Sequence, residues 1–260
     1  MAMNKRRVYD QMEQVVAFSF PPQRIVSLVP SQTEFLHTLG LDDRVVAITK
    51  FCVHPESWRH SKVIIGGTKQ FSIEKIHALQ PDLVIGNKEE NYPEGIAELK
   101  KHYPVWMSDI FTVEDALDMM KRVGDLTGTS ENADLIIQNI QNAFLEFPIT
   151  KPRRCVYLIW RDPYMVAGAS TFIHDILSRI GLMNVCGQPR YPVVTQEQLK
   201  YLDPELIMLS SEPYPFKQDH VEEIRKLLPD ADIRLVDGEM FSWYGSRMTE
   251  APNYFRSLNL

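Results

Sequence analysis

A repeated pattern constrains the fold of this chain more than any other feature of its sequence. Residues 72–85 contain, in order, a hydroxyl residue, a glutamate, a leucine, a proline, an acidic residue and an apolar run. The same order returns in residues 195–208, where Glu197 takes the place of Glu74. A unit that recurs in this way predicts two similar lobes, and a common type of helix-to-strand connection is the alternative explanation.

Two further segments repeat in step with the first one. Residues 24–29 are echoed by residues 154–160, and residues 35–41 by residues 176–182. Short apolar runs alternate with helical patterns in both halves of the chain, and this alternation is typical of α/β architecture. We therefore expect two pseudo-symmetric α/β lobes, each with a central sheet flanked by helices.

The first lobe contains clear local signals. Ser31 and Glu34 have the spacing of a capping box, which predicts a helix that begins at Ser31, runs to Leu39 and ends at Gly40. The other elements expected in this lobe are strands at 24–29, 45–49, 63–65, 82–86 and 105–107 and a helix at 73–79.

The middle of the chain has the pattern of a helical connection. A helix is expected from Thr112 to about Leu126, before Gly128, and a second one from Ser130 to Phe147, before Pro148. Apolar residues recur along the second helix at near-helical intervals, which predicts one buried stripe. The members of this stripe are Leu135, Ile136, Ile140, Phe144 and Leu145.

These signals together predict the domain organisation. The expected parts are an N-terminal extension (1–23), an N-terminal lobe (24–111), a helical connector (112–150) with a single long backbone helix at 130–147, and a C-terminal lobe (151–260).

Composition and charge exclude several classes of protein. The 260 residues are 44% hydrophobic and 24% charged, as in ordinary globular proteins and unlike disordered ones. The formal net charge of −6 argues against a nucleic-acid binder, which needs an excess of basic residues. No apolar run reaches the about 18 residues of a membrane-spanning helix, and no apolar core of a secretory signal follows the basic start of the chain. We therefore expect no export signal and no membrane span.

The loops at the ends of the predicted strands are the expected ligand site. Two lobes joined by a helix create a cleft, and α/β sheets bind ligands at the carboxyl ends of their strands. These loops are rich in aromatic residues, which suit a large, planar, partly apolar ligand better than a bare ion. The expected ligand-binding residues are Ser31, Phe51, His54, Thr68, Asn87, Trp160, Tyr191, Phe241 and Trp243.

Signals for metal or phosphate binding are weak. Cys52 and His54 lie on one predicted loop with His60 close behind, but no further ligands have a recognisable spacing, so we expect no metal site. Gly66 and Gly67 follow a strand, where a tight turn is a better explanation than a phosphate loop. The cysteines are expected to be reduced core thiols, and a disulfide between Cys155 and Cys186 is the alternative. The third cysteine is Cys52.

Signals for catalysis are equally weak. Asp109, Asp162 and Glu212 lie on predicted strand-end loops, but nothing in the sequence pairs them for acid–base chemistry. We therefore expect no catalytic residues, and we expect that the protein is not an enzyme. A cytoplasmic two-lobed α/β enzyme of the transferase type, acting on a ligand in the same cleft, is the alternative function.

Several of these motifs together resemble one known family, the substrate-binding proteins of ABC importers whose lobes are joined by a rigid helix. The similarity lies in residues 22–34, in residues 66–68 and 72–85, and in residues 195–199. It covers about residues 10–258 and is closest to the cobalamin-binding members. The resemblance implies a ligand-binding protein with no intrinsic cofactor, whose cleft holds cobalamin, haem or a ferric siderophore.

The resemblance also implies partners and a location. In the family, glutamates at the positions of Glu74 and Glu197 dock on arginines of the membrane permease, one from each lobe. The cobalamin-binding type also ties its last helix to the second lobe by a disulfide, whereas residues 253–258 contain no cysteine. The expected partners are a small-molecule ligand and an ABC permease. We expect no binding to nucleic acid, and we expect the protein to be monomeric. Family members are periplasmic or held at the cell surface, and the expected lack of an export signal leaves a cytoplasmic location open.

Overall fold

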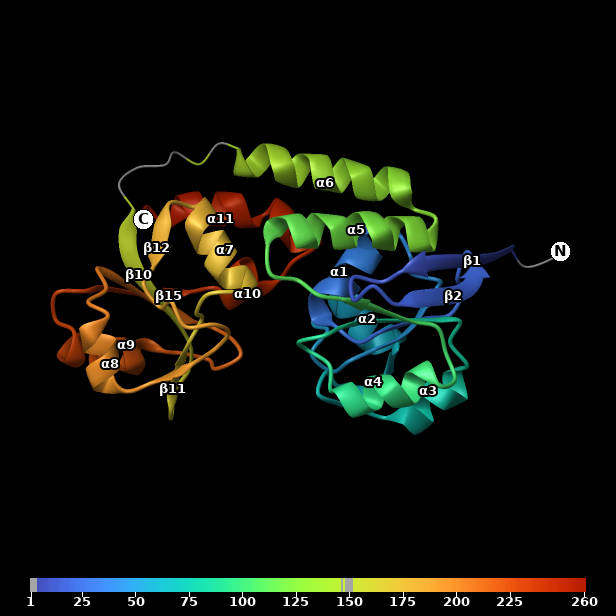
Figure 1. Cartoon of the computed structure of the whole chain (residues 1–260), viewed down its shortest axis with the longest axis horizontal. Helices are drawn as coiled ribbons and strands as arrows, with labels where there is room; N and C mark the ends of the chain where they lie inside the picture. Colours follow the sequence, from blue (N-terminus) through green and yellow to red (C-terminus); the bar gives the residue numbers. More distant parts are fainter. Residues whose placement is uncertain (1–3, 146, 148–151) are drawn as a thin grey trace. The chain divides into compact units, whose positions relative to one another are not determined.

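The computed structural model describes residues 4–145, 147 and 152–260, and its chain divides into two compact units (Figure 1). Unit 1 consists of Met1–Ile110, Glu114–Ile140 and Tyr244–Thr249. Unit 2 consists of Phe111–Val113, Gln141–Trp243 and Glu250–Leu260. One of the passages between the units, from Ile140 to Gln141, falls within the helix that begins at Ser130.

Unit 1 is built on a parallel sheet of five strands with the order β5-β4-β3-β8-β9. Its strands are β3 (Ile25–Ser27), β4 (Val45–Ile48), β5 (Val63–Ile64), β8 (Leu83–Asn87) and β9 (Val105–Ser108). Strands β3, β8 and β9 are buried along their whole length because helices cover the sheet, which explains their largely apolar sequences. All five strands lie where the sequence predicts them, with bounds that differ by one or two residues.

Helices and two small antiparallel ribbons complete unit 1. The helices are α1 (Pro30–Thr38), α2 (Glu56–Ser61), α3 (Ile73–Leu79), α4 (Pro93–Lys100), α5 (Val113–Thr127), α6 (Ser130–Phe144) and the 3-10 helix η1 (Ser246–Thr249). The ribbons are β1 (Asn4–Tyr9) with β2 (Val15–Phe20), and β6 (Gly66–Gly67) with β7 (Gln70–Phe71). The ribbon β1–β2 was not expected, because residues 1–23 were predicted only as an N-terminal extension.

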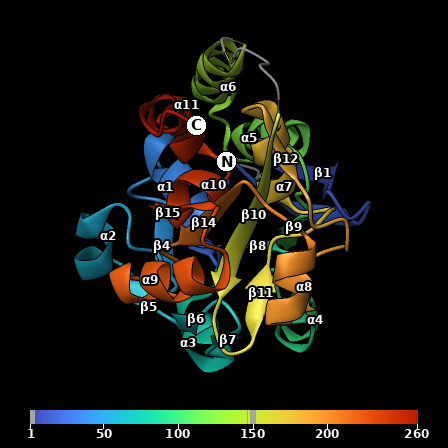
Figure 2. The ribbon, with the colours of Figure 1, turned by 90° about the vertical axis from the view of Figure 1, so that its left-hand side faces the viewer.

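Unit 2 is built on a mixed sheet with the order β13-β11-β10-β14-β15 (Figure 2). Strands β10, β14 and β15 are parallel, β11 and β13 are antiparallel additions, and β12 pairs with the start of β10. The strands are β10 (Arg153–Trp160), β11 (Tyr164–Val166), β12 (Leu182–Asn184), β13 (Val193–Val194), β14 (Leu206–Ser210) and β15 (Asp232–Val236). The helices are α7 (Phe172–Arg179), α8 (Gln196–Tyr201), α9 (Gln218–Leu227), α10 (Gly238–Ser242) and α11 (Ala251–Ser257).

The repeated segment has the same local geometry in both units, which confirms the pseudo-symmetric α/β fold. Ser72 caps α3 and Thr195 caps α8, each by accepting a hydrogen bond from the amide three residues further on. After each helix one residue adopts a left-handed backbone, Gln80 with φ of 48° and Asp203 with φ of 47°. The connection from α3 to β8 in unit 1 therefore has the same local structure as the connection from α8 to β14 in unit 2.

The first parallel strand of each unit is also anchored in the same way. The backbone amide of Arg24 donates to the Asp82 carboxylate at 2.8 Å, and that of Arg154 donates to the Glu205 carboxylate at 2.8 Å. The guanidinium group of each arginine donates to the carbonyl of an equivalent leucine at the end of the helix. These leucines are Leu79 and Leu202.

Helix α1 corrects the prediction of a capping box. It begins at Pro30 with Val29 as its N-cap, and no side chain caps it. Proline is favoured at the start of a helix because its missing N–H would have no partner there. Ser31 consequently lies inside the helix and is buried, while the carboxylate of Glu34 pairs with Arg247. The capping-box prediction was therefore wrong.

Helix α6 is shorter than predicted and buries a narrower stripe. It ends at Phe144, whereas Phe147 is not helical and Pro148 lies outside the described residues. Leu135 is 62% exposed and Leu145 is 82% exposed, so the predicted stripe is wrong at both positions.

The buried face of α6 includes a small residue at its contact with α5. Ala133 and Ile140 are fully buried. A Cβ atom on Gly124 of α5 would lie 2.6 Å from the Cβ of Ala133, so α5 and α6 approach each other closely at this point (Figure 1). The glycine and the alanine allow this approach, which a stripe of larger residues would prevent.

Residues 244–249 belong to unit 1, although the predicted boundaries place them in the second lobe. We call them the returning segment. Tyr244 donates a hydrogen bond to Glu90 at 3.0 Å, and Arg247 forms a two-pronged ion pair with Glu34 at 2.6 and 3.1 Å. Gly245 has φ of 109° and leaves no room for a side chain against α1, since an added Cβ would lie 3.3 Å from both Phe35 and Ser31. The segment is thus fitted closely to α1.

Two properties concern the described residues as a whole. No helix among them is long and apolar enough to cross a membrane. Cys52, Cys155 and Cys186 are free thiols, and all three are buried.

Candidate functional site

The end of β10 in unit 2 carries a partly exposed aromatic cluster. Trp160 is the last residue of this strand and is 39% exposed. Its ring meets the ring of Tyr214 edge to face, with 5.6 Å between the centroids. Tyr214 packs in turn against Phe216 at 4.8 Å and against His220 at 5.4 Å. The cluster therefore presents the partly exposed indole of Trp160 against other aromatic rings, and such a surface suits contact with a planar ligand.

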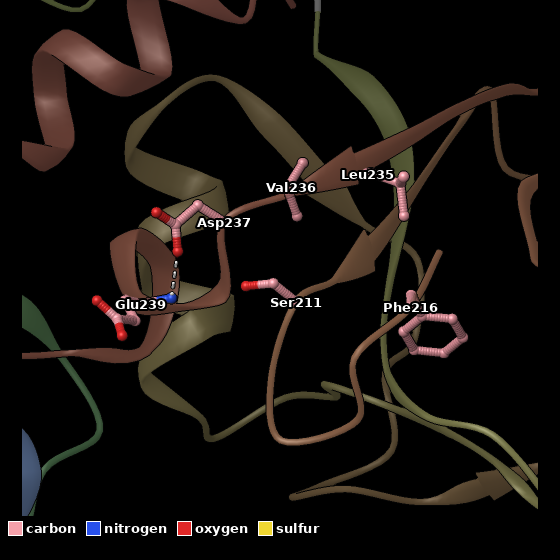
Figure 3. Close-up of a pocket in the computed structure, with 6 residues that line it drawn as sticks. All are labelled: Ser211, Phe216, Leu235, Val236, Asp237 and Glu239. Atoms are coloured by element: carbon pink, nitrogen blue, oxygen red, sulfur yellow. Dashed lines mark hydrogen bonds between the residues drawn. The ribbon is translucent and has the colours of Figure 1, made fainter. Parts of the chain in front are cut away.

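A hollow of about 510 Å³ lies at the carboxyl ends of β14 and β15 in the same unit (Figure 3). Its apolar wall contains Phe216, Leu235 and Val236, and its polar wall contains Asp237 and Glu239 together with Ser211. The Ser211 hydroxyl accepts a hydrogen bond from the amide of Gly238, and the Asp237 carboxylate accepts one from the amide of Glu239. These bonds fix the start of α10, so the polar wall has a defined shape.

Glu212 lies beside this hollow but is held inside the unit. Its Oε1 atom accepts hydrogen bonds from Ser242 Oγ and Trp243 Nε1, both at 2.8 Å. Burial raises the pKa of Glu212 above its ordinary value, although these hydrogen bonds oppose the shift. The indole N–H of Trp243 is thereby engaged with this carboxyl group.

Replacing Glu212 by glutamine is expected to stabilise the protein at neutral pH more than at acidic pH. A glutamate in an unfolded chain has a pKa of about 4.3, and the pKa of Glu212 in the folded protein is higher. The free energy of unfolding of the wild type therefore decreases as the pH rises above about 4.3, because the buried carboxyl group ionises less readily than in the unfolded chain. Glutamine keeps an oxygen for Ser242 and Trp243 and does not ionise. Thermal unfolding at about pH 4 and about pH 7 should show a gain over wild type only at the higher pH. Equal shifts at both pH values would contradict this explanation.

Phe241 does not take part in the exposed cluster. Its side chain is fully buried and packs against Tyr157 at 5.1 Å and Phe255 at 4.7 Å. A ring without exposed surface belongs to the hydrophobic core of unit 2, so we leave Phe241 out of the proposed contacts. Tyr191, by contrast, is partly exposed in the segment that precedes β13.

In unit 1 the loop after β4 presents Phe51, which is 51% exposed. The ring lies against Gly67, since an added Cβ there would be 3.1 Å from it, and the ammonium group of Lys50 lies 4.9 Å from the ring centroid. Gly66, with φ of 113°, and Gly67 form strand β6, and the turn of the β6–β7 ribbon consists of Thr68 and Lys69, so the tight turn predicted at the two glycines lies just after them. His54 and Thr68 on the neighbouring loops are partly exposed.

Ser31 and Asn87 were expected to contact ligand, but both are buried at the carboxyl edge of the sheet. The side-chain amide of Asn87 donates to Ser108 at 2.9 Å, and its oxygen accepts from the amides of Glu89 and Glu90. Asn87 therefore shapes the loop after β8. Both polar groups of its side chain are engaged in these hydrogen bonds.

Cys52 does not have the character of a metal ligand. Its sulfur lies 3.1 Å from the Thr33 hydroxyl and 3.2 Å from the Thr49 hydroxyl, inside unit 1. Burial raises the pKa of this thiol, so the thiolate that metals prefer is disfavoured. Within the described part of the chain, no group of three histidine, cysteine or acidic residues could hold a metal ion.

The three acidic residues considered for catalysis lie in separate settings. Asp109 pairs with Lys88 at 2.5 Å, and Asp162 pairs with Arg161 at 3.1 Å. Glu212 is engaged as described above. Each of these three carboxylates therefore has other hydrogen-bond or ion-pair partners.

Glu74 and Glu197 are exposed at equivalent positions of the two units. Each is the second residue of its helix, α3 or α8. The backbone amides at the start of α8, with the Thr195 hydroxyl, lower the pKa of Glu197, so that carboxylate is charged at neutral pH. Both side chains are accessible to a partner.

The residues behind Trp160 were not predicted from the sequence. Tyr214, His220 and Glu223 were not among the predicted site residues. The three-residue spacing of His220 and Glu223 places them on one face of α9, a signal that is present in the sequence. Nothing local, however, connects that face with Trp160.

The fold and these strand-end residues define a ligand-binding protein with two similar α/β units. A comparison with family models agrees, since the model described as "Periplasmic binding protein" matches residues 25–227. The chain belongs to this family.

Curated relatives are similar over most of the chain. A vitamin B12-binding protein from Vibrio cholerae serotype O1 is 25% identical over 203 residues, which are 75% of this chain and 73% of the relative. The uncharacterized ABC transporter substrate-binding lipoprotein YvrC of Bacillus subtilis is 27% identical over 214 residues, which are 76% and 67% of the two chains.

Solved structures share the fold. The periplasmic vitamin B12-binding protein BtuF of Vibrio cholerae has a TM-score of 0.78 at 20% identity and covers 92% of this chain and 98% of its own. The periplasmic haem-binding protein RhuT from Roseiflexus sp. RS-1 also has a TM-score of 0.78 at 20% identity, with 92% and 99% covered. The siderophore-binding protein BauB has a TM-score of 0.77 at 16% identity, with 97% and 98% covered. The two-unit α/β architecture is therefore that of this family.

Proposed function

We propose that this protein captures a corrinoid such as cobalamin, or else haem or a ferric siderophore, and delivers it to an ABC permease. The family match establishes a binding protein, and the named relatives bind ligands of these three kinds. The observation that carries the proposal is the indole of Trp160, which is partly exposed at the carboxyl end of β10 on an aromatic base. Such a surface fits a large planar ring system.

The proposed contacts come from partly exposed residues at strand ends. In unit 2 they are Trp160 and Tyr191. In unit 1 they are Phe51 and its neighbours His54 and Thr68. The prediction that both units contact one ligand stays a prediction, as does a role for Ser31, Asn87 or Trp243 in binding.

A direct test is retention of ligand on the protein. The protein is mixed with cobalamin, with haem or with a ferric siderophore, passed through a desalting column and examined by visible absorption. We expect stoichiometric retention of one of the three and release of an unaltered molecule on denaturation. Chemical conversion of the bound molecule would favour the transferase alternative, and retention of none would overturn the proposal.

Trp160→Ala is expected to weaken binding of the retained ligand by about 1–3 kcal/mol, because the indole contributes apolar area and ring contact. Quenching of tryptophan fluorescence on titration measures this affinity. Tyr201→Ala is the control, since Tyr201 is an aromatic residue of the same unit that is 89% exposed on α8, away from the strand ends. An unchanged affinity of the Trp160→Ala variant would remove this residue from the site.

We further propose that Glu74 and Glu197 dock the protein on basic residues of its permease, at the periplasmic or cell-surface side of the membrane. Their equivalent, exposed positions on α3 and α8 support this role. Replacing both with alanine should leave the fold and ligand affinity nearly unchanged, since each exposed charge contributes less than about 1 kcal/mol. Transport by the permease in liposomes should fall, and so should salt-sensitive association with it.

The docking test has a matched control in the same helical setting. Glu94 and Asp219 are exposed acidic residues in the first turns of α4 and α9, outside the repeated position. Their double alanine variant has the same net charge as the docking variant and should transport normally. Equal loss of transport in both variants would show a general effect of charge and would contradict docking at Glu74 and Glu197.

A further inference from the structure

We propose that α9, through Glu223 and His220, positions the aromatic pair Trp160 and Tyr214, so that Glu223 is a positioning residue for ligand binding. This inference rests on the proposed function, because it assigns a role behind the proposed ligand contact at Trp160. It concerns only residues of unit 2.

Glu223 ties together the two sides of the turn that follows Trp160. Its Oε2 atom accepts hydrogen bonds from Arg161 Nε at 3.1 Å and Arg161 Nη2 at 2.8 Å, and its Oε1 atom accepts one from the Tyr164 hydroxyl. Arg161 lies directly after Trp160 at the end of β10, and Tyr164 begins β11. The carboxylate thus fixes both ends of a turn whose tip, Asp162, has a left-handed backbone with φ of 57°.

The charges at this turn favour a persistent contact. Partial burial acts to raise the pKa of Glu223, but the hydrogen bonds from Tyr164 and Arg161 outweigh it and the pKa is lowered. The hydrogen bond with Glu223 raises the pKa of Arg161. Both groups are therefore charged at neutral pH, and a bidentate pair of this kind has a defined geometry.

His220 holds the second ring of the pair. Its Nδ1 atom accepts a hydrogen bond from the amide of Lys217 at 2.8 Å, so the proton of the neutral ring lies on Nε2. The Nε2 atom lies 3.1 Å from the Tyr214 hydroxyl, to which it donates. The amide of Tyr214 also donates to the carbonyl of Ile159, next to Trp160. One face of α9 consequently controls both rings.

The test uses Glu223→Gln with Glu222→Gln as its matched control. Glu222 is the adjacent residue on α9, and its carboxylate pairs only with exposed groups, Arg225 at 2.6 Å and Gln218 at 3.4 Å. With 5-fluorotryptophan incorporated, the ¹⁹F resonance of Trp160 is identified by its disappearance in Trp160→Phe. In ligand-free protein Glu223→Gln should shift and broaden this resonance, while Glu222→Gln should leave it unchanged. An unchanged Trp160 resonance in Glu223→Gln would overturn the proposal.

Ligand affinity provides the second arm. Glu223→Gln should weaken binding of the retained ligand roughly tenfold, as loss of a charge-assisted hydrogen bond predicts, and should have no effect in a Trp160→Ala background. A loss of the same size in that background would show that Glu223 does not act through Trp160. Tyr164→Phe removes only one donor to Glu223 and should weaken ligand binding by a smaller factor. This variant replaces Glu223→Gln in the test if Glu223→Gln fails to fold. The ¹⁹F arm needs no ligand, so it decides the positioning role even if none of the three ligands is retained.

Discussion

Arg247→Ala is expected to lower the free energy of unfolding of unit 1 by about 3–5 kcal/mol. The guanidinium group of Arg247 is only 10% exposed and forms a two-pronged pair with the Glu34 carboxylate, which is 18% exposed. Removing the arginine leaves the Glu34 charge largely buried without its main partner, and the cost of that uncompensated charge dominates the loss. The returning segment should also detach from α1, because the ion pair and Tyr244 are its main polar contacts with unit 1.

Hydrogen exchange measured by mass spectrometry can follow this change within unit 1. Amides of η1 and α1 should exchange faster in Arg247→Ala, and the midpoint of urea unfolding should fall. Lys101→Ala is the control, since its pair with Glu98 lies on the surface of the same unit at 65% and 41% exposure and should contribute under about 1 kcal/mol.

A double variant separates the charge effect from simple loss of contact. Arg247→Met with Glu34→Leu removes both charges and should recover much of the stability lost in Arg247→Ala, because apolar replacement of a buried pair is often nearly neutral. A double variant as unstable as the single one would show that the contact itself, and not the stranded charge, holds the returning segment.

Local patterns explain why much of the fold was predictable. The helix at 73–79 and the strand after it were expected at nearly their observed bounds, because a hydroxyl cap, an apolar run and a proline act within a few residues of each other. The same signals in the second copy led to two similar lobes. The ribbon β1–β2 was missed because its alternation spans only a few residues, of which Val16 and Phe18 are buried.

Long-range contacts explain what could not be predicted. Glu34 and Arg247 are far apart in the sequence, and the local spacing of Ser31 and Glu34 indicated a capping box that the proline at position 30 displaced. The contacts of the returning segment with α1 are also long-range, and no local pattern in the sequence indicates them. At the site, aromatic composition placed Trp160 and Phe241 in the same predicted ligand site, and it could not show that Trp160 is partly exposed whereas Phe241 is buried. Exposure is a property of the packed units and not of local sequence.

Phe241→Ala is expected to show the opposite behaviour to Trp160→Ala. Phe241 is fully buried among Tyr157, Tyr254 and Phe255, so its truncation leaves a cavity and should lower the free energy of unfolding of unit 2 by about 3–5 kcal/mol. Ligand affinity, measured well below the unfolding temperature, should stay within about twofold of wild type, because the ring offers no surface to a ligand.

The two variants together separate a core aromatic residue from a contact residue. Trp160→Ala should lose affinity and keep most of its stability, because its side chain is 39% exposed and leaves little cavity. Phe241→Leu fills most of the volume and should recover most of the stability lost in Phe241→Ala. If Phe241→Ala instead lost affinity at a temperature where it is fully folded, the ring would become exposed during binding. Phe241 would then return to the ligand site that the aromatic pattern of the sequence first assigned to it.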